Sequence, residues 1–263
     1  MNVYSIVNSI SRATGDQSEE AFKADLYSLF NSFNRMLAIN HDLIILPTQI
    51  ALVSSFGQIY VQLLNVLPVQ EVAKIVKLTI DCLPPEPNVA LVQAKLRCIH
   101  DTVKSEIFQN IDSRVELFEV FTRHLKKHML QQQELKTCST ILGDMLTYLH
   151  HEQSKSTQKH HSVSREVEIL VLVLLETLIY CVKELDRSSP VKGPLVACLV
   201  ALLRLMEDQH YNHLWEKFGN IRQRRDRRQL KEFLLSVFIV FHNFVKQDVF
   251  PSDWVVMRML TNQ

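Results

Sequence analysis

The stretch "ILVLVLLETLIYCV", residues 169–182, decides the fold class. Its first half is rich in β-branched residues, so taken alone it fits a buried strand as well as a helix. The apolar pattern continues past Glu176 through Leu178 and Val182, and an apolar run of this length is typical of a helix. Because the stretch contains Glu176 and is shorter than the roughly 20 apolar residues that cross a bilayer, we expect no transmembrane helix.

Helical spacing of apolar residues extends in both directions from this stretch, and no strand pattern competes with it. Residues that open or end helices lie between the apolar runs. The expected opening residues are Ser18, Pro47, Pro68, Asn88, Asp112, Ser164 and Pro194, and Gly219 is the expected end of the ninth helix. The predicted helices cover about 18–37, 47–64, 68–80, 88–107, 112–125, 132–151, 164–185, 194–208, 211–218 and 226–247.

Taken in pairs, these helices repeat at a regular spacing. The pairs begin about 44 to 52 residues apart, which is longer than the 34-residue tetratricopeptide repeat and nearer the armadillo and HEAT repeats of about 40–47 residues. We therefore predict an all-α fold, an armadillo/HEAT-like α-solenoid of stacked antiparallel helix pairs with about ten to eleven helices. We expect one helical-repeat region over residues 1–263, a fragment of a larger protein, with a polar loop at residues 153–162.

Composition and motifs disfavour an enzyme. The chain has 5 glycines in 263 residues and a formal net charge of +1, so it has little material for phosphate-binding loops and no global field that attracts nucleic acid. No nucleotide-binding, serine-hydrolase or zinc-protease motif occurs, and we expect no catalytic residue, cofactor or metal. His124 and His128 are four residues apart and fit two metal ligands, but an ordinary surface pair is the favoured interpretation. The five cysteines lack CxxC spacing and are expected to be buried, reduced thiols.

One local charge cluster stands out in the segment "IRQRRDRRQ", residues 221–229. Its five arginines could contact anionic lipid headgroups or an acidic partner, because arginine binds phosphate and carboxylate groups in bidentate fashion. A solvated segment between two helices is the favoured interpretation, although cations that run into a helix N-terminus oppose its dipole and so argue for a partner. No aromatic residue alternates with the arginines, which disfavours nucleic acid. The arginines are Arg222, Arg224, Arg225, Arg227 and Arg228.

The last 31 residues, "FLLSVFIVFHNFVKQDVFPSDWVVMRMLTNQ" (233–263), resemble the helical region of the DOCK (dedicator of cytokinesis) family. That family carries a helix, a V[FY]P-x-DW turn and a second helix with two methionines. The matching turn residues here are Pro251, Asp253, Trp254 and Met257, to which we assign a structural role. Segments such as "SEIFQNIDSRVELFEVFTRHLKKHM", residues 105–129, look similar to the family in the same order.

The resemblance implies a function that composition does not reveal. DOCK proteins are cytosolic guanine-nucleotide exchange factors for Rho-family GTPases, mainly Rac, with a lipid-binding domain, an armadillo-like middle and a C-terminal exchange domain. This chain is similar to the middle, so we expect a non-catalytic scaffold that links the two domains in cytoskeletal signalling. We expect a cytoplasmic protein with recruitment to the plasma membrane, acting with ELMO-type adaptors and anionic phospholipid through other regions. The alternative is an independent armadillo/HEAT-like adaptor or trafficking protein unrelated to GTPases.

The apolar residues that follow the DW turn admit two structural interpretations. Trp254, Val256 and Leu260 fit the first turns of a further repeat, because the residues near Gln263 lack the polarity of a capping helix. The alternative is a short helix that folds back on the helix expected at residues 226–247. We favour the further repeat.

Overall fold

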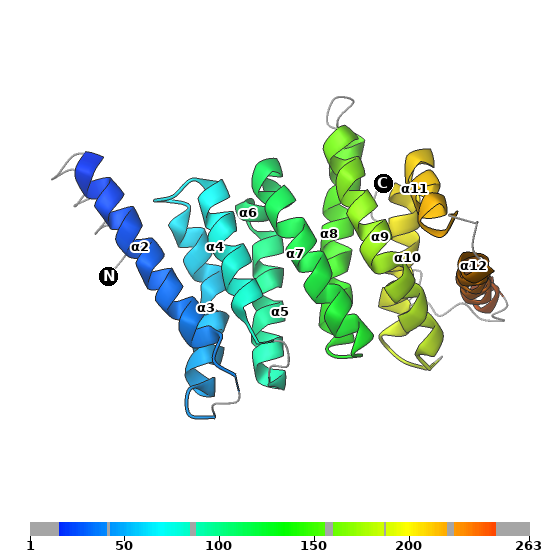
Figure 1. Cartoon of the computed structure of the whole chain (residues 1–263), viewed down its shortest axis with the longest axis horizontal. Coiled ribbons are helices and arrows are strands. Elements are labelled where there is room, and N and C mark those ends of the chain that lie inside the picture. The colour runs from blue at the N-terminus through cyan, green and yellow to red at the C-terminus, as the bar shows by residue number, and fades with distance from the viewer. Residues whose placement is uncertain are drawn as a thin grey trace. The chain divides into compact units, whose positions relative to one another are not determined.

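The computed structural model describes residues 16–40, 43–84, 88–155, 160–186, 188–219 and 224–245. Within these residues the chain forms eleven helices and no strand (Figure 1). The chain divides into two compact units at Val120 and Phe121, inside helix α7 (Ile111–Leu130). The all-α prediction is confirmed, and each of the ten predicted helices corresponds to a helix of the structure. The prediction of one helical-repeat region over residues 1–263 stays a prediction.

An aromatic contact joins α2 to α3 in the first unit. Phe30 and Phe33 of α2 pack against Phe56 and Tyr60 of α3, with ring centroids 5.9 to 6.4 Å apart. Phe33 meets Phe56, whereas the earlier Phe30 also meets the later Tyr60, so the two helices run antiparallel. Among the described residues, the helices of this unit before α7 are α2 (Asp16–Leu37), α3 (Leu46–Leu63), α4 (Val69–Cys82), α5 (Val89–Lys104) and α6 (Glu106–Gln109).

Polar side chains cap several helices of the first unit, and only some of these caps are the residues expected from the sequence. Asn88 caps α5, because its side chain accepts a hydrogen bond of 2.9 Å from the amide of Ala90. The predicted helix 88–107 breaks at Ser105, which is extended and caps the short helix α6 through the amide of Ile107. The predicted cap at Asp112 is wrong, because Asn110 accepts from the amide of Asp112 at 3.0 Å and α7 begins at Ile111.

The second unit stacks helices that are two apart in the chain. It contains the end of α7 and α8 (Leu135–Lys155), α9 (His160–Glu184), α10 (Lys192–Leu205), α11 (Asp208–Gly219) and α12 (Arg224–Val245). Cys198 of α10 donates to the carbonyl of Ser139 in α8, with the sulfur 3.3 Å from the oxygen. Consecutive helices also pack together, α9 against α10 and α11 against α12. This arrangement of stacked helix pairs is the one predicted from the spacing.

Helix α9 lies in the middle of the second unit and explains the long apolar stretch. Leu170, Leu174 and Leu178 are fully buried, whereas Glu176 is exposed. The helix begins at His160 and α8 continues to Lys155, so both helices extend into the predicted polar loop 153–162. The predicted cap at Ser164 is therefore wrong.

His128 corrects the expectation of a surface histidine pair with His124. Its side chain is fully buried, and its Nδ1 atom lies 3.2 Å from the Oε1 atom of Gln133. Across the described ranges, no three histidine, cysteine or carboxylate side chains gather as a metal site would require. Nor do the helices in those ranges include one long and apolar enough to cross a membrane. All five cysteines are free, and four of them are buried.

Candidate binding surfaces around helix α12

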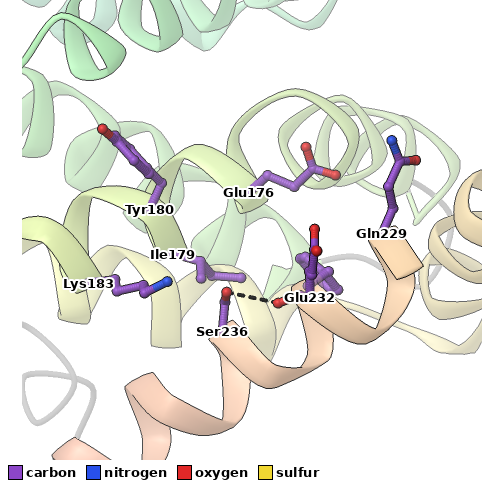
Figure 2. Close-up of a pocket in the computed structure, with 8 residues that line it drawn as sticks. Glu176, Ile179, Tyr180, Lys183, Gln229, Glu232 and Ser236 are labelled. Carbon is purple, nitrogen blue, oxygen red and sulfur yellow. Dashed lines mark hydrogen bonds between the residues drawn. The ribbon is translucent and has the colours of Figure 1, made fainter. Parts of the chain in front are cut away.

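An open groove of about 500 Å³ lies between α9 and α12 in the second unit. Figure 2 shows Gln229 near the Glu176 end of the groove and Ser236 near the Lys183 end, so the two helices run in the same direction along it. The groove combines apolar, acidic, basic and amide side chains. Its lining residues are Glu176, Ile179, Tyr180, Lys183, Gln229, Glu232, Phe233 and Ser236.

The groove wall on α12 is held by local contacts. The hydroxyl of Ser236 donates to the carbonyl oxygen of Glu232 at 2.8 Å (Figure 2). The carboxylate of Glu232 accepts from Nε of Arg228, also at 2.8 Å. Both side chains of this ion pair are more than half exposed, so it contributes little to stability. The groove is thus a mixed, solvent-open surface rather than a closed catalytic pocket.

The arginine cluster marks the beginning of α12. Arg224, Arg225, Arg227 and Arg228 lie in the first turns of the helix, and Arg222 lies outside the described residues. The side chain of Arg228 is 82% exposed. Cations at a helix N-terminus oppose the helix dipole, so this placement costs a small amount of stability. The structure thus places four of the five arginines on one short helical segment.

The outward face of α12 carries an exposed apolar strip, Leu234, Leu235 and Phe238. These side chains are 37%, 59% and 67% exposed. At 100° per residue they lie on the side of the helix opposite to Phe233 and Ser236, which face the groove. The sequence did not reveal this strip, because periodicity alone does not say which apolar residues of the helix a neighbouring helix covers.

A buried histidine holds α11, which packs against α12, onto α9. The Nδ1 atom of His210 accepts from the amide of Glu207 at 2.8 Å, so Nε2 carries the proton and donates to the carbonyl of Ser164 at 2.8 Å. One helical turn further along both helices, His213 pairs with Glu168 at 2.8 Å. The contact between His210 and Ser164 was not predictable from the sequence, because the two residues are 46 positions apart.

The residues of the DW turn give no structural test. Pro251, Asp253, Trp254 and Met257 lie outside the described residues, as do Val256 and Leu260. Their structural role, and the two interpretations of the segment that follows the turn, stay predictions.

Comparisons with known proteins agree with the stacked helices. A family model described as the dedicator of cytokinesis (DOCK) TPR region matches residues 4–263. Dedicator of cytokinesis protein 3 of Mus musculus is 37% identical over 270 residues, which cover 96% of this chain and 13% of the relative. Dedicator of cytokinesis protein 4 of Homo sapiens is 34% identical over 268 residues, with the same two shares. Since the family model matches nearly the whole chain, this chain belongs to the DOCK family.

Proposed function

We propose that this chain is a non-catalytic helical scaffold of a DOCK-type guanine-nucleotide exchange factor for Rac and other Rho-family GTPases. It links the lipid-binding and exchange domains in cytoskeletal signalling. The observation that carries the proposal is the family match over residues 4–263, together with the stacked helices that the described residues form. The chain spans 13% of the length of the relatives it matches. We assign the lipid-binding domain and the exchange domain to other parts of the protein.

The packing of the helices supports a structural role. Polar side chains serve as helix caps or fasten one helix to another, as the half-buried Asn110 and the buried His210 do. Arg114 is buried and donates to the carbonyl of Gln109 at 3.3 Å, where it holds the end of α6. Within each unit, stacked helices of this kind hold their neighbours in place, and a linker between domains needs such rigidity.

The partners follow from the same proposal. A Rho-family GTPase binds the exchange domain, and ELMO-type adaptors and anionic phospholipid bind regions outside this chain. The proposed location is the cytoplasm, with recruitment to the plasma membrane. Nucleic acid is not a proposed partner, because the formal net charge of the chain is only +1.

Nucleotide release tests the non-catalytic assignment. The isolated chain is added at micromolar concentration to Rac and, separately, to Cdc42 loaded with a fluorescent guanine nucleotide. Full-length mouse dedicator of cytokinesis protein 3 serves as the reference. We expect the release rate with the chain to equal the spontaneous rate. Faster release from either GTPase would show that the chain itself exchanges nucleotide and would overturn the non-catalytic assignment.

A further inference from the structure

We propose that the outward face of α12 is a contact surface for an anionic lipid bilayer. The face consists of Arg228, Lys231, Leu234, Leu235 and Phe238. At 100° per residue these five residues lie within about 120° of the helix circumference. All five are exposed. This inference goes beyond the scaffold function, because it gives this chain a membrane contact of its own.

The distribution of residue types matches a helix that lies in a bilayer interface. The apolar side chains form one strip, with Phe238 67% and Leu235 59% exposed. The basic residues occupy the N-terminal end of the same face, and the side chain of Arg228 is 82% exposed. Helices at membrane interfaces combine leucine and phenylalanine with lysine and arginine in this way, so that the apolar groups enter the acyl region while the cations bind headgroups.

Charge complementarity selects the lipid. From Lys217 through Lys231, with both ends included, the sequence contains seven basic residues and one acid, Asp226. Among the described side chains of α12, no acidic residue lies on the outward face. The acid nearest to that face, Glu232, lines the groove side and pairs with Arg228. A cationic end next to an exposed apolar strip fits a surface that presents phosphate groups above hydrocarbon.

The groove side of α12 fixes the orientation that this contact requires. Phe233 and Ser236 face α9, and Val240 is 6% exposed. The helix is therefore anchored to the second unit by the face opposite to the proposed contact surface. A bilayer would meet a preformed helix and would not have to order a free peptide, so the binding energy is not spent on folding.

Co-sedimentation with vesicles tests the proposal. The chain is mixed with phosphatidylcholine vesicles and with the same vesicles containing phosphatidylserine, at low and physiological salt. We expect binding to the anionic vesicles only, stronger at low salt. The charge variant R228Q/K231Q and the apolar variant L235Q/F238Q should each lower the partition coefficient about tenfold. The matched controls K104Q/K136Q and L78Q change exposed residues of α5, α8 and α4 and should bind as the unchanged chain does.

A fluorescent probe tests whether the face enters the bilayer. Because the native cysteines are mostly buried, F238C can be labelled selectively with an environment-sensitive dye, and L78C carries the same dye as the control. We expect iodide to quench both probes without lipid. On addition of anionic vesicles, only the probe at position 238 should shift to shorter wavelength and lose its quenching.

Several results would overturn the proposal. One is equal binding of the unchanged chain and both outward-face variants. Another is a probe at position 238 that is already shielded from iodide without lipid, because another part of the chain would then cover the strip. A third is binding to polyglutamate beads, reduced by the same variants, without binding to vesicles. That result would assign the face to an acidic protein partner.

Discussion

The replacement Gly57→Ala measures how closely α3 and α5 approach each other. A methyl group at Gly57 would place its carbon 2.8 Å from Cβ and 2.9 Å from Oδ2 of Asp101. Carbon atoms pack best at about 3.5–4.0 Å, so the added atom overlaps its neighbour by close to 1 Å. The Cβ atom of Asp101 is fixed to the α5 backbone and does not move by a side-chain rotation, so the two helices must shift apart.

Two opposing effects set the magnitude. Alanine stabilises a helix interior by about 1 kcal/mol relative to glycine. Overpacking in a closely packed interface costs about 1–3 kcal/mol. We therefore expect Gly57→Ala to lower the free energy of unfolding by about 1 kcal/mol. Gly143 in α8 is the matched control, because its nearest neighbour, Sγ of Cys198, lies 4.0 Å from the added methyl position. There the helix propensity acts alone, and Gly143→Ala should stabilise by up to about 1 kcal/mol.

Urea unfolding followed by far-ultraviolet circular dichroism measures both variants. Because the chain has two compact units, the curves are fitted with two transitions where two are resolved. We expect the midpoint to fall for Gly57→Ala and to rise for Gly143→Ala, a difference of about 2 kcal/mol between the variants. A rise of the same size for both would refute the close approach of α3 and α5.

Three further predictions concern buried groups. Gln49 is 2% exposed and donates from Nε2 to the carbonyls of Met36 and Ile39, both at 2.9 Å, so it caps the C-terminal end of α2. Gln49→Met leaves these carbonyls without a donor and should lower the free energy of unfolding, measured in urea, by about 1–3 kcal/mol. An unchanged urea midpoint would contradict this cap. Burial raises the pKa of Cys98 to about 12 and that of Cys181 to about 11, so a disulfide reagent at pH 8 should modify these thiols rapidly only after unfolding. The unfolded thiols ionise near pH 9, whereas the folded thiols stay protonated to about pH 11–12. Their contribution to the free energy of unfolding is therefore fully present below pH 9 and is lost as the pH rises toward 11–12. The urea midpoint should be lower at pH 10 than at pH 8.

Helix positions were predictable because burial imposes a period on the apolar residues. The stretch at residues 169–182 lies in α9, as its length indicated, and Asn88 caps the helix that it was expected to open. Helix ends were less predictable, because several candidate caps lie within a few residues. Asn110 caps α7 two positions before the expected Asp112, and only the backbone conformation distinguishes them.

Tertiary contacts account for the other differences. Ser164 has the side chain of an N-cap, but it lies inside α9 and its carbonyl oxygen accepts from His210. His128 lies among charged neighbours in the sequence and is nevertheless fully buried beside Gln133. The exposed strip with Phe238 depends on which face of α12 meets α9, and the sequence of one helix does not specify its neighbour.

The most direct test of the scaffold assignment replaces a segment in a relative. In full-length mouse dedicator of cytokinesis protein 3, the 270 residues that match this chain are exchanged for the chain itself or for a glycine-serine linker of equal length. Each protein is expressed in cells at matched levels, and GTP-bound Rac is measured by effector pull-down. We expect the chain to preserve the Rac activation of the unchanged protein and the flexible linker to abolish it. Equal Rac activation with the chain and with the linker would contradict a scaffold role for the stacked helices.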